Sequence, residues 1–169
     1  MEQLKSLLNK SFIVGVALGG LAALPIGFAM GVYYLPILVA SEGADEEQLI
    51  IAQANTLARA SFTRDLKGSD RLHWGEGTLI ISTEGGQTYA TLDGQVSPGP
   101  DYKLYLSPQF VDDEASFLAV KQDSLKVADI TGFTNFRVML PVTAKVRDYA
   151  AVVVWCERFG EFITAGHLE

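Results

Sequence analysis

The stretch YAAVVVWC, residues 149–156, decides the fold of this chain. β-Branched valines closed by an aromatic residue are typical of a strand that is covered on both faces, because an exposed face would carry alternating polar residues. The run therefore predicts a strand in the middle of a sheet. Its two-residue period assigns alternate side chains to opposite faces. One face carries Val152, Val154 and Cys156, and the other carries Ala151, Val153 and Trp155.

Short alternating runs separated by turn residues surround this strand from Ser61 onward. They predict further strands, giving the set Thr78–Ser82, Thr88–Leu92, Tyr102–Ser107, Phe117–Lys121, Asn135–Leu140, Tyr149–Glu157 and Glu161–Thr164. The glycines at 85 and 86 favour a hairpin turn between the first two. Pro98-Gly99-Pro100 cannot join a ladder, and with Asp101 it is expected to shape a loop near one end of the fold. Short strands without alternating helices predict an all-β domain over residues 61–169, either an antiparallel β-sandwich or a barrel-like sheet.

Residues 11–41 contain no charged side chain, and this apolar run is longer than the ~20 residues that span a bilayer. Lys5 and Lys10 precede it, and an acidic segment follows. The positive-inside rule therefore predicts one transmembrane helix over 11–41, with residues 1–10 in the cytoplasm and the C-terminal domain outside, in the periplasm or the extracellular space. A cleaved signal peptide is the alternative, but its hydrophobic region is only ~7–15 residues long.

Residues 42–60 predict a juxtamembrane helical linker. Asp45 and Gln48 have the spacing of a capping box, and apolar residues from Leu49 to Ala58 form one stripe. Within the expected span, Gly15–Gly19 and Gly27–Gly31 repeat the GxxxG spacing that lets a second helix approach closely. The expected partners are membrane lipid and another membrane protein or complex.

The charge balance excludes one class of partner. The chain has 13 Lys and Arg against 20 Asp and Glu, a net charge of -7. An acidic chain of this kind is not expected to bind nucleic acid, because a polyanion needs a basic surface. Nucleophile-elbow, phosphate-loop and HExxH motifs are absent, so the sequence offers no recognisable hydrolase or nucleotide site.

Cys156 is the only cysteine, so an intrachain disulfide is excluded. In an oxidising compartment such a thiol can be oxidised, or can ligate a metal or haem. Equally, a free cysteine can act as a small buried hydrophobic residue. His73 and His167 are the only histidines, and neither has the short spacing to Cys156 of a known metal motif. A covalent c-type haem is excluded because the C-x-x-C-H run is missing.

Several segments between Phe62 and Leu168 carry a family resemblance. They are His73 with Gly75 and Gly77 before TLII at 78–81, GPDYKLYLS at 99–107, Gly132 with Asn135-Phe136, Leu140-Pro141, and DYAAVVVWC at 148–156 with Phe159, Phe162, Ala165 and Leu168. In these segments the chain resembles the DM-thirteen electron-transfer domain family of small all-β extracytoplasmic modules. The family's characteristic cysteine falls on Cys156. The resemblance implies either a free redox thiol or an attachment point for a prosthetic group such as haem.

Two hypotheses follow. In the first, the chain is a membrane-anchored extracytoplasmic redox or electron-transfer accessory domain. Cys156 is then its catalytic thiol or prosthetic-group ligand, His73 is a second cofactor-binding residue, and haem is the candidate cofactor. In the alternative, the chain is a non-enzymatic subunit or binding module of a membrane protein complex, and Cys156 fills the core. The first hypothesis requires a thiol that reacts in the folded protein, whereas the second requires only burial.

Overall fold

The computed structural model describes residues 10–169. The expected cytoplasmic segment 1–10, including Lys5, lies outside the described residues apart from Lys10. The chain divides between Leu35 and Pro36 into a helical unit and a compact C-terminal unit.

Helix α2 (Lys10–Leu38) is the only helix in the described chain that is long and apolar enough to cross a membrane. Its candidate span, Phe12–Leu38, has 27 residues. Its most apolar 18-residue window has a mean hydropathy of 2.1, and none of that window is buried by protein. At 1.5 Å per residue this span is about 40 Å long, more than the ~30 Å hydrocarbon core of a bilayer. Length and composition fit a membrane anchor, and they also fit a signal sequence.

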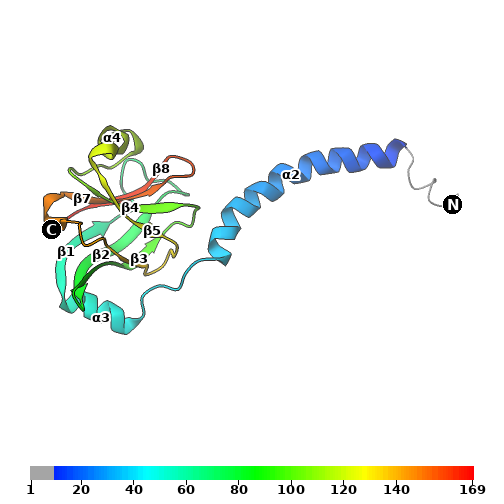
Figure 1. Cartoon of the computed structure of the whole chain (residues 1–169). Helices are drawn as coiled ribbons and strands as arrows, with labels where there is room; N and C mark the ends of the chain where they lie inside the picture. Colours follow the sequence, from blue (N-terminus) through cyan, green and yellow to red (C-terminus); the bar gives the residue numbers. More distant parts are fainter. Residues whose placement is uncertain (1–9) are drawn as a thin grey trace. The chain divides into compact units, whose positions relative to one another are not determined.

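The C-terminal unit is built on two four-stranded antiparallel sheets (Figure 1). One sheet has the order β1 (Thr56–Phe62), β2 (Gly75–Glu84), β3 (Gln87–Val96) and β6 (Arg137–Met139). The other has the order β5 (Leu125–Ile130), β4 (Tyr102–Ser107), β7 (Ala151–Cys156) and β8 (Glu161–His167). Four short helices accompany them, namely α3 (Glu46–Ala54), α4 (Glu114–Val120), η1 (Lys121–Asp123) and η2 (Val146–Asp148). The predicted antiparallel β architecture, preceded in sequence by one N-terminal helix, is confirmed. The four short helices mean that the domain is not purely β.

Strand β7 occupies the predicted position inside its sheet, between β4 and β8. Its alternation is also confirmed. Val152, Val154 and Cys156 lie in the main core, whereas Val153 and Trp155 lie in a second apolar cluster on the other face. The hairpin at Gly85 and Gly86 is confirmed too, since both residues have positive φ and join the paired strands β2 and β3.

Two predicted elements were wrong. The segment Phe117–Lys121 is not a strand, because helix α4 runs from Glu114 to Val120 and begins at a capping box of Asp113 and Ser116. The linker helix is shorter than the predicted 42–60. It begins at the predicted Asp45–Gln48 capping box but ends at Ala54, and Thr56–Phe62 forms strand β1. Strand β5 was not predicted at all.

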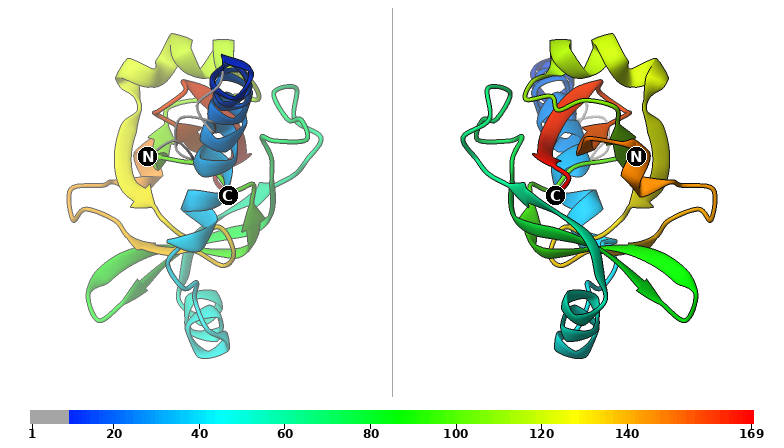
Figure 2. Two further views of the ribbon diagram at one scale, coloured as in Figure 1. Left: turned by 90° about the vertical axis from the view of Figure 1, so that its right-hand side faces the viewer. Right: turned by 90° about the vertical axis from the view of Figure 1, so that its left-hand side faces the viewer.

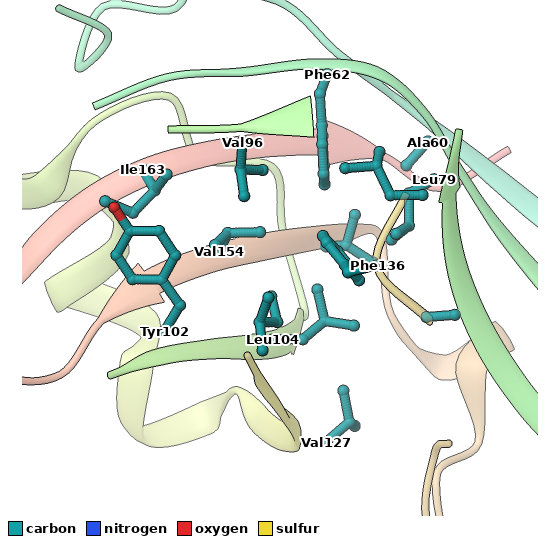
Figure 3. Close-up of a cluster of buried hydrophobic side chains, with 14 of the residues drawn as sticks. Ala60, Phe62, Leu79, Val96, Tyr102, Leu104, Val127, Phe136, Val154 and Ile163 are labelled. Carbon is teal, nitrogen blue, oxygen red and sulfur yellow. The ribbon is translucent and has the colours of Figure 1, made fainter. Parts of the chain in front are cut away.

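The main core fills the space between the sheets. Figure 3 shows side chains of the two sheets pointing toward one another. One sheet contributes Ala60, Phe62, Leu79 and Val96, and the other contributes Tyr102, Leu104, Val154 and Ile163. Phe136, from the β5–β6 connection, lies among them. The second cluster lies on the far face of β7, where Phe117 of α4 packs against Tyr105 and Trp155. Figure 2 shows α4, in yellow-green, lying across this side of the sheet.

The segment before α3 belongs to the same unit. The backbone N–H of Ser41 donates to the carbonyl of Thr131 at 3.0 Å, and that of Ala44 donates to the carbonyl of Asn135 at 2.6 Å. Gly43 has no room for a side chain, because a Cβ there would clash with the carbonyl of Thr134. Residues 41–44 are therefore attached to the β5–β6 connection by backbone hydrogen bonds.

Strands β1 and β8 meet at a seam that joins the two sheets. Arg59 and Glu169 exchange two backbone hydrogen bonds of 2.9 Å each. Gly166 permits this approach, because a Cβ there would lie 2.7 Å from the carbonyl oxygen of Ser61 and 3.1 Å from the Cβ of Ala60. One side of the sandwich is thus nearly closed, as in a barrel.

We predict that Gly166→Ala lowers the free energy of unfolding by about 1–3 kcal/mol, because the added methyl separates β1 from β8. The measurement is chemical denaturation of the full chain in detergent. The control is Thr83→Ser, which removes a methyl from an exposed position of β2 and is expected to change stability by less than ~0.5 kcal/mol. Equal stability of Gly166→Ala and the control would show that the seam is not closely packed.

Candidate functional site

Cys156 lies at the last position of β7, and only 2% of it is exposed. It is paired across the ladder with Tyr102, and its side chain belongs to the main core. Its surroundings are not wholly apolar, since the thiol donates a hydrogen bond to the carbonyl oxygen of Pro100 at a sulfur–oxygen distance of 3.0 Å. The thiol is therefore covered by the loop between β3 and β4.

That covering loop, residues 97–101, is held by several close contacts. Gly99 packs on the hydroxyl of Tyr102 so closely that a Cβ would clash with it. Asp101 adopts a left-handed conformation with φ of 60°, and its carbonyl accepts the backbone N–H of Glu157 at 3.1 Å. Ser97 donates its backbone N–H to the carbonyl of Trp74 at 2.9 Å. The GPDY run thus forms the predicted loop, and its carbonyls bind both the thiol and the residue after it.

Electrostatics keep this thiol protonated. Burial raises the pKa of Cys156 above its ordinary value, and the carboxylates of Asp101 and Glu161 act in the same direction. The backbone N–H groups of Phe159 and Arg158, in the turn after β7, oppose the shift because they can donate to sulfur. The net effect is an uncharged thiol near neutral pH, which is a weak nucleophile while the loop is closed.

A second polar cluster lies on the opposite face of β7 and was not predicted from the sequence. The Tyr105 hydroxyl donates to one carboxylate oxygen of Glu157, and the Lys121 ammonium donates to the other at 2.7 Å. Burial opposes ionisation of Glu157, but Lys121 and Tyr105 outweigh it, so the pKa of this carboxyl lies below its ordinary value. The Lys121 Nζ also lies 5.0 Å from the ring centroid of Trp155, the residue before Cys156 in the chain. These residues are too far apart in sequence to be recognised as a group.

His73 occupies a different place. It is half-buried, and its Nδ1 lies 3.1 Å from a carboxylate oxygen of Asp70. It lines a cavity of about 430 Å³ together with Asp113, Glu161 and Phe162, and Cys156 is not among the lining residues. No hydrogen bond or ion pair joins His73 to Cys156 in the structure of residues 10–169. The two residues that the sequence singled out are not brought into one site.

The arrangement limits the possible haem and metal roles of these residues. Within the part of the chain that the structure describes, no group of three His, Cys, Asp or Glu side chains is placed to hold a metal ion. The sulfur of Cys156 is bonded to Pro100 beneath the loop, and His73 opens into a separate cavity. The arrangement does not fit a haem held by Cys156 and His73 together.

The observed features define a class of protein: a small antiparallel β-sandwich domain with a single thiol covered by a loop at one end. Comparison with known proteins gives the family. The electron transfer DM13 family model matches residues 61–168, and the chain belongs to that family. No curated protein and no solved structure matched the chain significantly.

The raised pKa of Cys156 has a measurable consequence. Above pH 9.0, the ordinary value, the unfolded chain releases the thiol proton while the folded chain retains it. The unfolded state then binds fewer protons, so this group lowers the stability of the fold as the pH rises. We predict that the free energy of unfolding declines more steeply above pH 9.0 in the native protein than in Cys156→Ala.

Below that pH the two proteins are expected to change in parallel, because the thiol is then protonated in both the folded and the unfolded native chain. Denaturation series at stepped pH provide the measurement. Identical slopes above pH 9.0 would contradict the raised pKa.

Proposed function

We propose that the chain is a membrane-anchored, extracytoplasmic redox accessory domain in which Cys156 becomes reactive when the loop of residues 97–101 opens. Membership of the electron transfer DM13 family supports a role related to electron transfer. The observation that carries the proposal is the hydrogen bond between the Cys156 thiol and the Pro100 carbonyl. It places the only thiol under a single loop, where displacement of a few residues would change both the exposure and the pKa of the thiol.

Opening of the loop would change the chemistry of the sulfur in two ways. Hydration would remove the burial that raises the pKa of the thiol, and departure of Asp101 would remove a neighbouring carboxylate. The backbone N–H groups of Arg158 and Phe159 belong to the turn after β7 and would remain to stabilise the thiolate. Opening of the loop would therefore lower the pKa of Cys156 and increase its thiolate fraction.

The reaction proposed for the open state is thiol–disulfide exchange. The Cys156 thiol gives its proton to water, and the thiolate attacks one sulfur of a disulfide on a partner molecule. A new sulfur–sulfur bond forms to Cys156 while the partner's own bond breaks, and the second partner sulfur leaves as a thiolate. The sulfur of Cys156 is thereby oxidised to the disulfide level and the departing partner sulfur is reduced to the thiolate level, so the exchange needs no other oxidant or reductant.

The location is part of the proposal. The uncharged run 11–41, followed by the acidic domain and preceded by lysines, favours helix α2 as an anchor with the domain in the periplasm or outside the cell. Such a compartment is oxidising, so the Cys156 thiol would encounter disulfide or thiol partners there once the loop opens. The glycines spaced as GxxxG favour a membrane protein as the neighbour of the helix.

A second candidate function is favoured by the 2% exposure of Cys156. In this alternative the chain is a non-enzymatic subunit or binding module of a membrane complex, and Cys156 only fills the core beside Val154. The two functions differ in how the thiol becomes exposed, through local opening of the loop or through unfolding of the whole domain.

We predict that Gly99→Ala increases the rate at which a maleimide labels Cys156 in the folded full-length chain by at least about tenfold. The added methyl would clash with the Tyr102 hydroxyl and shift the loop equilibrium toward the open form. A tenfold change corresponds to about 1.4 kcal/mol of destabilisation of the closed loop. Labelling is followed by intact mass in detergent.

The control is Gly85→Ala, which strains a positive-φ position in the β2–β3 turn, where a Cβ has free space around it. It is expected to cost stability without changing the labelling rate. If both variants label faster in proportion to their loss of global stability, exposure occurs by unfolding and the core-filling alternative is correct. The redox proposal also requires Gly99→Ala to form a mixed disulfide with oxidised glutathione faster than the native chain.

A further inference from the structure

A cavity of about 500 Å³ lies at the end of the domain away from Cys156. Its walls come from β1, from the segment before β7 and from the residues after β8, and its lining is Leu57, Ala58, Thr88, Ala144, Lys145, Val146, Arg147, Tyr149, Leu168 and Glu169. Figure 1 shows β1 and the C-terminal end of the chain together at one end of the sandwich, with the β7–β8 turn at the other. Cys156 and this cavity are separated by the six-residue length of β7, about 17–20 Å.

The cavity is a continuation of the main core. Ala58, Ala144, Val146, Tyr149 and Leu168 all pack against the core on one side and line the cavity on the other. The sandwich is therefore left open at this end, where apolar side chains meet solvent. Mouths of β-barrels and similar apolar openings are common places for small ligands, and 500 Å³ lies within the usual range for such sites.

The charges around the opening favour an anion. Lys145 and Arg147 both line it, and the side chain of neither makes a hydrogen bond or ion pair with any other of the residues 10–169. Glu169 is the only acidic residue of the lining. In a chain with a net charge of -7, this is a local excess of positive charge beside an apolar wall.

We propose that this cavity binds an anionic amphiphile, with its hydrocarbon chain against Val146, Tyr149 and Leu168 and its anionic head between Lys145 and Arg147. Burial of the hydrocarbon chain against these walls supplies the hydrophobic part of the affinity. The two cations select the head group, because only an anionic head can form ion pairs with them. A carboxylate and a phosphate monoester share this chemistry. The inference is independent of the redox role of Cys156.

The test uses the full chain in lipid nanodiscs and an octanoate probe that carries a photoreactive diazirine near the end of its chain. Irradiation followed by peptide mass spectrometry identifies the labelled residues. We expect labelling within residues 144–149 and at Leu57 or Leu168. Excess octanoate or octyl phosphate should compete, and octanol should not. The stronger competitor of the two anions identifies the head group.

Two variants make the test specific. Lys145→Glu with Arg147→Glu reverses the charge of the opening and is expected to reduce site labelling by about tenfold or more. Its matched control is Arg71→Glu with Lys126→Glu, which reverses two exposed cations outside the cavity. Ala144→Leu fills part of the cavity and should reduce labelling without any change of charge.

Each outcome of these experiments either supports or overturns the proposal. Loss of site labelling in the Lys145 and Arg147 variant but not in its control supports the proposal. Labelling spread over the domain, or equal labelling in both charge variants, would overturn it. Competition by octanol as effective as by octanoate would also overturn it, because the cavity would then bind apolar chains without selecting an anion.

Discussion

The structure depends on the burial of both faces of β7. A strand with neighbours on both sides satisfies its backbone hydrogen bonds within the sheet, and its side chains can then be apolar on each face. In this domain, the two faces enter different apolar clusters, one between the sheets and one beneath α4. Adjacent residues of β7 therefore have unrelated environments. Trp155 packs with Phe117 and near Lys121, whereas Cys156 enters the main core and meets the covering loop.

The thiol lies at one end of the main core. Cys156 is the last residue of β7, and its sulfur is covered by a loop that passes over the end of the strand. Residues 97–101 form that cover. Two hydrogen bonds hold them, one from the Glu157 amide to the Asp101 carbonyl and one from the Cys156 thiol to the Pro100 carbonyl. The cover relies on a few polar contacts, while the strand relies on a whole ladder. Local opening of the loop is for that reason less costly than loss of the sheet.

Much of this architecture could be predicted from the sequence, because periodic burial leaves a pattern. The valine run indicated a central strand and gave the correct faces, and the glycine pair at 85 and 86 marked a hairpin. The prediction failed where a short apolar run is compatible with both the 3.6-residue period of a helix and the two-residue period of a strand. Phe117 lies in a helix because the Asp113–Ser116 capping box favours helix initiation, and Leu57 and Ala58 lie in a strand because β1 completes a sheet.

The candidate site was predicted less completely. Cys156 was singled out, and Pro98–Asp101 was correctly placed in a loop, but the contact between the two joins positions 56 residues apart. The Tyr105–Glu157 pair is separated by 52 residues, and such pairs follow from strand order rather than from local spacing. His73 was singled out by its residue type and by its place in the family resemblance, and the fold places it in a cavity that Cys156 does not line. Chemistry-bearing residues can be recognised in a sequence, but their neighbours require the topology.

The proposed function requires that the loop over Cys156 opens independently of the domain. The most direct measurement is native-state hydrogen exchange of the Glu157 amide, which donates to the Asp101 carbonyl, compared with the amide of Val153 in the middle of β7. The account predicts that the Glu157 amide exchanges with a lower opening free energy, little affected by low concentrations of denaturant, while the Val153 amide exchanges through global unfolding. Equal opening free energies with equal denaturant dependence would contradict it.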